Sequence, residues 1–213
     1  RPPADGAYLG AYVQPDTDYT PQGRIDAVTQ FEKATRRKLD IVQTYHPWED
    51  DFPDATDKWA VDSGRMLLLS WAGTDTRVIQ SGRYDNLIRQ RAREVKALGK
   101  PIFLRWRWEM DRPNLQASIW TPQDFIAAWR HIRTIFAEEQ ATNVSWVWCP
   151  TAAGFSDTDR AAPYYPGDSD VDWVCADVYT GQKLDTFQEA AAGFLAWAKG
   201  HPGKPIMIGE WAT

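Results

Sequence analysis

Short apolar runs alternate along this chain with segments whose apolar residues recur at helical spacing. The runs are rich in β-branched and aromatic residues and are bounded by Pro, Gly or Asp, which is typical of buried parallel strands. They predict seven strands, at residues 7–13, 40–45, 66–72, 101–109, 144–150, 171–179 and 205–211. Their starts recur at intervals of about 25 to 45 residues, the size of a βαβ unit.

The segments between the strands predict amphipathic helices. Pro122 suits the first turn of one helix, and Gly99 suits the position just after the end of another. The expected buried stripes are Ile25, Val28, Phe31 and Ala34; Ile88, Ala92, Val95 and Leu98; Phe125, Ala128, Trp129, Ile132 and Phe136; and Phe187, Ala191, Phe194 and Leu195. Residues 54–64 predict a shorter and weaker helix.

Seven strands in one direction with helical crossovers fit an α/β fold, a (β/α)8 TIM barrel, better than an open sheet. No G-x-G-x-x-G motif follows the first strand, which removes the main support for a dinucleotide-binding fold. We expect residues 1–213 to form a single domain. We also expect the last β/α unit of the barrel to be absent from this sequence, and residues beyond Thr213 to exist.

The amino-acid composition limits the classes of partner that this chain is expected to bind. Lys+Arg 24 against Asp+Glu 29 gives a net charge of −5, which argues against nucleic acid or an anionic membrane as the main partner. No zinc spacing, P-loop or Ser-His-Asp order occurs, so we expect neither a metal nor a cofactor, and we expect a monomer. The 12 tryptophans are unusually many. We expect about half to fill the core and the others to offer flat faces for binding.

Candidate chemistry gathers where the strands end, which is where barrel enzymes build their sites. Aromatic or carboxylate residues follow six of the seven strands, and flat aromatic rings stack on the C–H faces of sugars. Glu109 and Glu210 end the fourth and seventh strands, where a carboxylate costs free energy unless it is paired or used. Glycoside hydrolysis needs two carboxyl groups with separate tasks, so this pair predicts a glycosidase.

The order of several multi-residue strings resembles glycoside hydrolase family 26, the β-mannanase-type members of a large clan of retaining barrel glycosidases. The resemblance covers roughly residues 66–211. The strings that carry it are residues 69–71, 81–85, 99–105, 109–110, 141–144, 146–148, 164–168, 171–173 and 208–210.

The resemblance implies roles for individual residues. Glu109 is expected to be the acid/base and Glu210 the nucleophile, with Arg105 and Tyr179 beside the nucleophile. The other expected substrate-binding residues are Trp71, Trp108, Trp148, Trp211, His46 and Asp111. One departure matters, because mannanase-type members carry His immediately before the acid glutamate, and here that position is Trp108. An indole donates one hydrogen bond and accepts none, which puts mannan specificity in doubt.

We therefore predict a retaining endo-glycoside hydrolase, an endo-β-mannanase or a related endo-glycanase. Its substrate is expected to be a β-linked polysaccharide, mannan-like or another hemicellulose or glucan, and hence we expect secretion. The long loop at residues 151–170 is expected to form one wall of an open cleft. Two alternatives stay open: a non-catalytic carbohydrate-binding protein on a glycosidase scaffold, and a transglycosylase.

Two further groups of residues have a structural interpretation. If Trp148 and Tyr179 both point into the core, strand alternation directs Cys149 outward and Cys175 inward, which disfavours a disulfide. The acidic residues Glu49, Asp50, Asp51, Asp54 and Asp57 lack the D-x-D-x-D-G pattern of a calcium loop. We expect them to form a solvated face.

Overall fold

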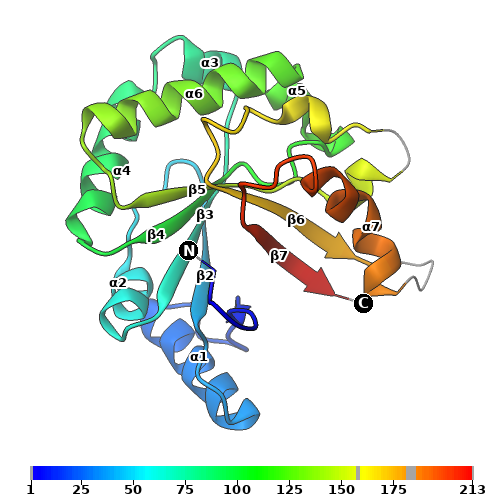
Figure 1. The fold of residues 1–213 in the computed structure, drawn as a ribbon. Coiled ribbons are helices and arrows are strands. Elements are labelled where there is room, and N and C mark those ends of the chain that lie inside the picture. The colour runs from blue at the N-terminus through cyan, green and yellow to red at the C-terminus, as the bar shows by residue number, and fades with distance from the viewer. Residues whose placement is uncertain (1, 157–158, 181–185, 213) are drawn as a thin grey trace.

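A computed structural model describes residues 2–156, 159–180 and 186–212 of the chain. Seven parallel strands form one curled sheet in which each strand pairs with the next one along the chain, in the order β1 to β7 (Figure 1). The strands are β1 (Gly10–Ala11), β2 (Ile41–His46), β3 (Met66–Trp71), β4 (Ile102–Trp106), β5 (Val144–Trp148), β6 (Trp173–Tyr179) and β7 (Ile206–Ala212). The predicted barrel architecture is thus confirmed in its strand order and direction.

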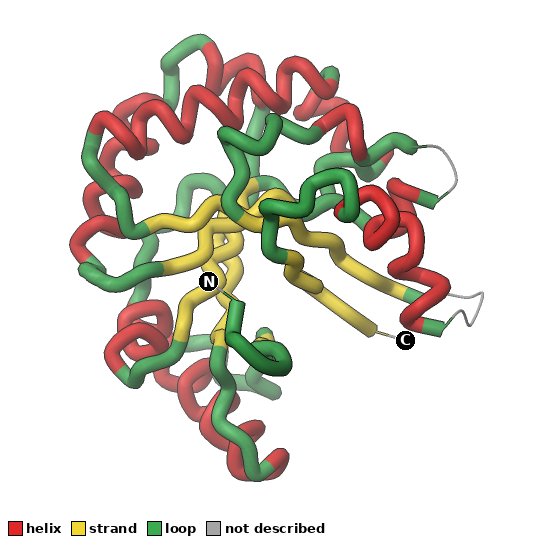
Figure 2. The backbone as a smooth tube through the Cα atoms, in the orientation of Figure 1, coloured by secondary structure: helices red, strands yellow, loops and turns green. Residues whose placement is uncertain are grey.

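Helices surround the outside of the strands (Figure 2). They are α1 (Pro21–Thr35), α2 (Ala55–Asp62), α3 (Thr76–Gln80), α4 (Asp85–Ala97), α5 (Gln116–Ile119), α6 (Pro122–Glu138) and α7 (Phe187–Ala198), with 3-10 turns η1 (Pro113–Leu115), η2 (Ala152–Phe155) and η3 (Ala162–Tyr164). The predicted caps are present, since Thr121 accepts from the backbone of Asp124 and Pro122 opens α6. No helix in the described ranges combines the length and apolar character that crossing a membrane requires.

Two strands differ from their predicted bounds. β1 has only two residues, so the rest of the apolar run at 7–13 lies outside the sheet. β4 ends at Trp106 because Arg107 and Glu109 adopt left-handed backbone conformations, with φ of 50° and 54°. Such values cannot continue a strand. Glu109 therefore lies in a turn beyond β4 and not within it.

The two faces of the sheet are both covered, but by different groups. Side chains alternate between the faces along each strand. Those toward the helices join the large core and include Leu67, Leu69, Trp71, Leu104, Trp106, Trp148 and Val174. Those toward the barrel interior include Ile41, Leu68, Phe103, Val147, Trp173 and Met207. Above this apolar layer, the interior positions nearer the strand ends are polar, which places the site described next.

The interior is accessible between the two outer strands. β1 pairs with β2 and β7 pairs with β6, and within the described residues β1 and β7 do not pair with each other. A cavity of about 640 Å³ extends from the N-terminal segment to β7. Tyr45, Tyr179 and Glu210 all line it.

Candidate active site

The position of Glu210 depends on a bulge in β7. Ala176 pairs with Ile208 and Asp177 pairs with Glu210, so Gly209 is an extra residue in the ladder. A bulge of this kind changes the alternation, and here it brings the Glu210 side chain to the interior face. A β-carbon on Gly209 would lie 2.5 Å from Asp177 Oδ1 and 2.7 Å from the sulfurs of Cys149 and Cys175. Only glycine fits there without displacing its neighbours.

Three donors from three different strands hold the Glu210 carboxylate. Tyr45 on β2 donates to Oε1 over 2.6 Å, and Tyr179 on β6 donates to Oε2 over 2.6 Å. Arg105 on β4 adds a 2.7 Å ion pair from Nη2 to Oε1. Both carboxylate oxygens are therefore oriented, and one face of the group remains toward the cavity.

These contacts set the protonation state of Glu210. Burial acts to raise its pKa, but the charge of Arg105 and the hydrogen bonds from Tyr179 and Tyr45 outweigh burial and lower it below the ordinary value. Burial raises the pKa of both tyrosines, so their hydroxyls stay protonated and can donate. The geometry favours an ionised Glu210.

A second carboxylate lies behind the arginine. Arg105 is fully buried, and its Nη1 donates to Asp177 Oδ1 over 2.9 Å while its Nε donates to Ser70 over 3.0 Å. Burial raises the pKa of Asp177 well above its usual value, and the charge of Arg105 opposes that rise. Because the guanidinium is fixed on three sides, the direction of its bond to Glu210 is fixed as well.

Glu109 lies on the turn after β4, facing the same end of the barrel. Its backbone N–H donates to the Cys149 carbonyl over 2.7 Å, which ties the turn to the end of β5. Its side chain is 12% exposed, and Oε2 accepts from Arg112 Nη1 over 2.7 Å. A half-exposed guanidinium thus accompanies this carboxylate, and the contact raises the pKa of Arg112.

Trp108 completes the inner wall of the site. The centroids of the Trp108 and Tyr45 rings are 5.2 Å apart. The Cζ atom of Arg105 lies 5.1 Å from the Trp108 ring centroid. The residue is partly buried and packs against the interior cluster. The structure therefore brings Trp108, Arg105, Tyr179 and Glu210 together, as the sequence led us to expect.

Comparison with known proteins places this geometry in a family. Residues 65–198 match the family described as glycosyl hydrolase family 26. The chain belongs to glycosyl hydrolase family 26. It is 30% identical over 230 residues to Endoglucanase H of Acetivibrio thermocellus, covering 98% of this chain and 24% of that protein. It is 32% identical over 143 residues to the β-1,3-xylanase TXYA of a Vibrio species, covering 62% of this chain and 28% of that protein.

Solved structures support the fold independently. A family 26 β-mannanase from Bacteroides ovatus superposes with a TM-score of 0.69 at 14% identity, covering 98% of this chain and 72% of that one. The catalytic domain of an endo-β-1,4-mannanase from Bacillus sp. JAMB-750 gives a TM-score of 0.73 at 14% identity, covering 96% and 66%. At this identity the likeness shows the fold alone. The family 26 chain spans about a quarter of the length of the curated relatives it matches.

Several predicted substrate contacts lie away from the site in this family 26 chain. Trp71 and Trp148 are fully buried on the helix side of the sheet. Trp71 stacks on Trp48 at 4.4 Å between centroids, and Trp148 packs against Trp197 at 5.1 Å. Neither ring is accessible to a ligand in the barrel, so the prediction that a sugar stacks on Trp71 and Trp148 is wrong. Their strand positions have the opposite parity to the interior residues.

Two other predicted contacts, His46 and Asp111, have structural roles, whereas Trp211 is accessible. His46 is buried and lies 2.9 Å from Asp57 on α2, so it joins β2 to that helix. Asp111 is buried and accepts from the Thr151 backbone over 2.8 Å, which anchors the connection after β5. Trp211 is 58% exposed and lines the cavity next to Glu210, and its ring lies 6.0 Å from Phe187.

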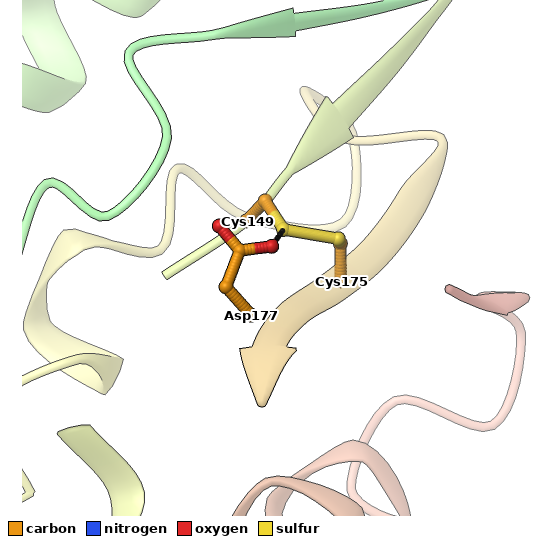
Figure 3. Close-up of side chains that lie close together, drawn as sticks. All are labelled: Cys149, Cys175 and Asp177. Atoms are coloured by element: carbon orange, nitrogen blue, oxygen red, sulfur yellow. Dashed lines mark hydrogen bonds between the residues drawn. A yellow bond between two sulfur atoms is a disulfide. The ribbon is translucent and has the colours of Figure 1, made fainter. Parts of the chain in front are cut away.

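The cysteine prediction is corrected. Cys149 and Cys175 form a disulfide that joins the end of β5 to β6, and Asp177 lies beside it, 3.3 Å from the Cys149 sulfur (Figure 3). Strand alternation disfavoured this bond only because Trp148 was placed in the interior. Since Trp148 faces the helices, Cys149 faces inward toward Cys175.

Two groups of potential metal ligands occur in the described part of the chain: Cys149, Cys175 and Asp177, and His46, Asp54 and Asp57. Each group has other bonds. In one, the two cysteine sulfurs are bonded to each other and offer no thiolate. In the other, Asp57 accepts from Thr44 over 2.6 Å and contacts His46, and Asp54 caps α2. The expected solvated acidic face is therefore wrong for Asp57, which is fully buried.

Sequence reasoning missed Tyr45 and Asp177 as functional residues. Both lie near the C-terminal ends of predicted strands, but at β2 we selected His46 instead of Tyr45. The parallel register provides the missing signal, because Tyr45 pairs with Ser70 and Ser70 pairs with Arg105. Residues in one register row of adjacent parallel strands share a face. Once Arg105 is placed inside, Tyr45 follows.

Proposed function

We propose that this chain is the catalytic part of a retaining endo-glycoside hydrolase, with Glu210 as nucleophile and Glu109 as acid/base. One observation carries the proposal: the Glu210 carboxylate is held by Arg105, Tyr45 and Tyr179 at the wall of an accessible cavity. A structural ion pair would not need two additional tyrosine donors on opposite oxygens. Family membership supports the same class of reaction.

The proposed reaction is a double displacement. In the first step, a Glu210 oxygen attacks the anomeric carbon, and the bond to the leaving oxygen breaks as that oxygen takes the proton of Glu109. In the second step, ionised Glu109 removes a proton from water, and the water oxygen displaces the Glu210 carboxylate from the anomeric carbon. The configuration is retained because it is inverted twice.

The residues around Glu210 support the proposed first step. An ionised carboxylate is the reactive form, and the positive charge of Arg105 favours that form at neutral pH. The two tyrosines fix the plane of the carboxylate, which limits the orientations in which it meets the sugar. Trp108 contributes an apolar wall beside Tyr45.

For the substrate we propose a β-linked glucan. Trp108 occupies the position at which mannanase-type members carry histidine, so a hydrogen-bonding ring is replaced by an apolar face with a single donor. The relative named Endoglucanase H matches over nearly the whole of this chain, which supports a glucan over a mannan. Action on a polysaccharide supports secretion.

A polysaccharide panel tests the proposal. Wild type and Glu210→Ala are assayed on glucans, mannans, xylans and arabinans, with reducing ends as readout, and proton NMR identifies the first-formed anomer. We expect turnover of a glucan by wild type, loss of at least a thousandfold in Glu210→Ala, and an initial β-anomer. Glu138→Gln serves as a folding-matched control, because it also removes a carboxylate charge but lies half-exposed on α6, outside the cavity lining.

The outcomes separate the alternatives. Equal product formation by wild type and Glu210→Ala would refute the assignment of the nucleophile. Glycan binding with no turnover by wild type would favour a carbohydrate-binding protein. Longer products formed from oligosaccharides would favour transglycosylation. An initial α-anomer would refute retention.

A further inference from the structure

Trp120 is an exposed aromatic residue in an unfavourable backbone conformation. It directly follows α5 and has φ of 66° and ψ of −87°, close to the rare classic γ-turn. Bulky residues seldom adopt positive φ, where glycine is favoured. The residue is nevertheless 45% exposed, so almost half of its surface remains accessible to a ligand.

The indole of Trp120 is held rigidly by polar neighbours. Its Nε1 donates to Asp75 Oδ2 over 3.1 Å, and the Arg77 guanidinium lies 4.4 Å from its ring centroid. Arg77 is fixed in turn by Asp124, which accepts from its Nη2 over 3.0 Å. The guanidinium covers one face of the ring, and within the described ranges no other ring lies against the indole.

Trp120 belongs to the face of the barrel that carries the candidate active site. It lies on the connection between β4 and α6, eleven residues after Glu109. Arg107 ties this connection to the one after β3, because its Nη1 donates to the Gly73 carbonyl over 3.0 Å. Thr76, buried at the start of α3, donates to the Ile119 carbonyl over 2.9 Å. The connections after β3 and β4 are thus joined at two points.

The contacts with Asp75 and Arg77 use the edge and one face of the indole, and they leave its other face without a role in the fold of the described residues. Glycine at this position would relieve the backbone conformation and would remove exposed apolar surface. The indole provides a flat apolar face, and the Asp75 carboxylate and the Arg77 guanidinium lie beside it as an acceptor and a donor. Arg77 Nη1 has no hydrogen bond to any described residue, and the Arg77 side chain is 54% exposed. Strained residues of this kind gather at ligand-binding positions.

We propose that Trp120, Asp75 and Arg77 form a second glycan-binding site, separate from the cleavage point. Its ligand is a pyranose unit of a polysaccharide chain, whose C–H face stacks on the open face of the indole. Hydroxyls at the edge of that sugar meet the Asp75 carboxylate and the Arg77 guanidinium. The site holds a long chain against the catalytic face, and the proposal rests on the proposed function for the identity of that chain.

Binding measured without turnover tests this site. In a Glu210→Ala background, affinity electrophoresis in gels containing soluble β-glucan compares Trp120→Gly, Trp120→Tyr and Trp59→Ala. Trp59 is the matched control because it also carries a stacked guanidinium, that of Arg65 at 4.6 Å, but lies within α2. We expect Trp120→Gly to weaken glucan binding by about five- to tenfold, Trp120→Tyr to retain most of it, and Trp59→Ala to retain all of it.

Thermal unfolding of each variant separates binding from folding. We expect Trp120→Gly to unfold cooperatively, so that weaker binding reports the missing indole and not loss of the fold. Equal binding by Trp120→Gly and Trp59→Ala, with both variants folded, would overturn the second site. If wild type cleaves glucan while Trp120→Gly binds normally, only this proposal fails. Binding that depends on Trp120, together with no turnover by wild type, would support the second site and refute the hydrolase. Absence of binding by every form would overturn it.

Discussion

Tyr45→Phe removes one hydrogen bond to the proposed nucleophile, together with the contacts of the same hydroxyl to Arg105 Nη2 at 3.2 Å and to the Gln43 side-chain amide at 2.7 Å. The substitution removes the hydroxyl that donates to Glu210 Oε1 over 2.6 Å. It keeps the ring and its edge contacts with Tyr12 at 5.0 Å and Trp108 at 5.2 Å between centroids. Arg105 and Tyr179 still hold the carboxylate, so its position should change little. The main effect should fall on the charge of Glu210.

The size of the effect follows from the contacts. A hydrogen bond to a charged group contributes about 1.5–3 kcal/mol. The Glu210 side chain is 17% exposed and keeps two other partners, so we take the lower end of this range. Because about 1.4 kcal/mol corresponds to one pKa unit, the pKa of Glu210 should rise by about one unit. Tyr45 lowers this pKa in the wild type, which fixes the sign.

The pH profile of kcat/KM is the assay. Glu210 must be ionised to attack, so the acid limb reports its pKa in the free enzyme. We expect this limb to move to higher pH by about one unit in Tyr45→Phe, with the alkaline limb unmoved. Tyr12→Phe is the control, because its ring touches Tyr45 but its hydroxyl lies outside the network. An acid limb that coincides with wild type, in a variant with unchanged thermal unfolding, would refute the assignment of the limb to Glu210.

Three further expectations concern the residues behind the nucleophile. Gly209→Ala should lower the free energy of unfolding by about 1–3 kcal/mol, because its β-carbon would meet Asp177 and both sulfurs, and an unchanged urea midpoint would contradict this. Reducing the Cys149–Cys175 bond, which closes a separation of 26 residues, should lower stability by about 2–4 kcal/mol; equal melting with and without reductant, once thiol titration shows reduction, would be inconsistent with it. Arg105→Lys should reduce kcat at least tenfold, since one ammonium cannot replace a fork that spans two carboxylates, and a twofold change would argue against the network.

The hydrophobic pattern was sufficient to predict the barrel. Apolar runs of strand length, bounded by turn residues, recur at the spacing of a βαβ unit, and this leaves few other arrangements. The bounds of strand four could not be predicted, because the apolar run continues through Trp108 while the backbone turns at Arg107. A left-handed residue in an apolar run has no signature in hydropathy.

The candidate site was predicted where strand parity could be applied correctly. Arg105 has the parity of the interior, and it lies there. His46, Trp71 and Trp148 were chosen for their chemistry and their place at strand ends, although their parity directs them toward the helices. Glu210 reaches the interior only through the bulge, which simple alternation does not predict. It was selected because a carboxylate ends an apolar strand, and the family resemblance then implied its role as nucleophile.

The distribution of the tryptophans also determines which events change the intrinsic fluorescence of this protein. Seven of the 12 indoles are buried in the described core, so most of the intrinsic fluorescence arises from rings that no ligand reaches. Unfolding should therefore shift the emission strongly, whereas a bound glycan should alter only a minor component. Aqueous quenchers should reach chiefly Trp120 and Trp211, the two most exposed indoles. If a glycan protects these indoles from the quencher, the loss of quenching reports that the glycan is bound near Trp120 or Trp211.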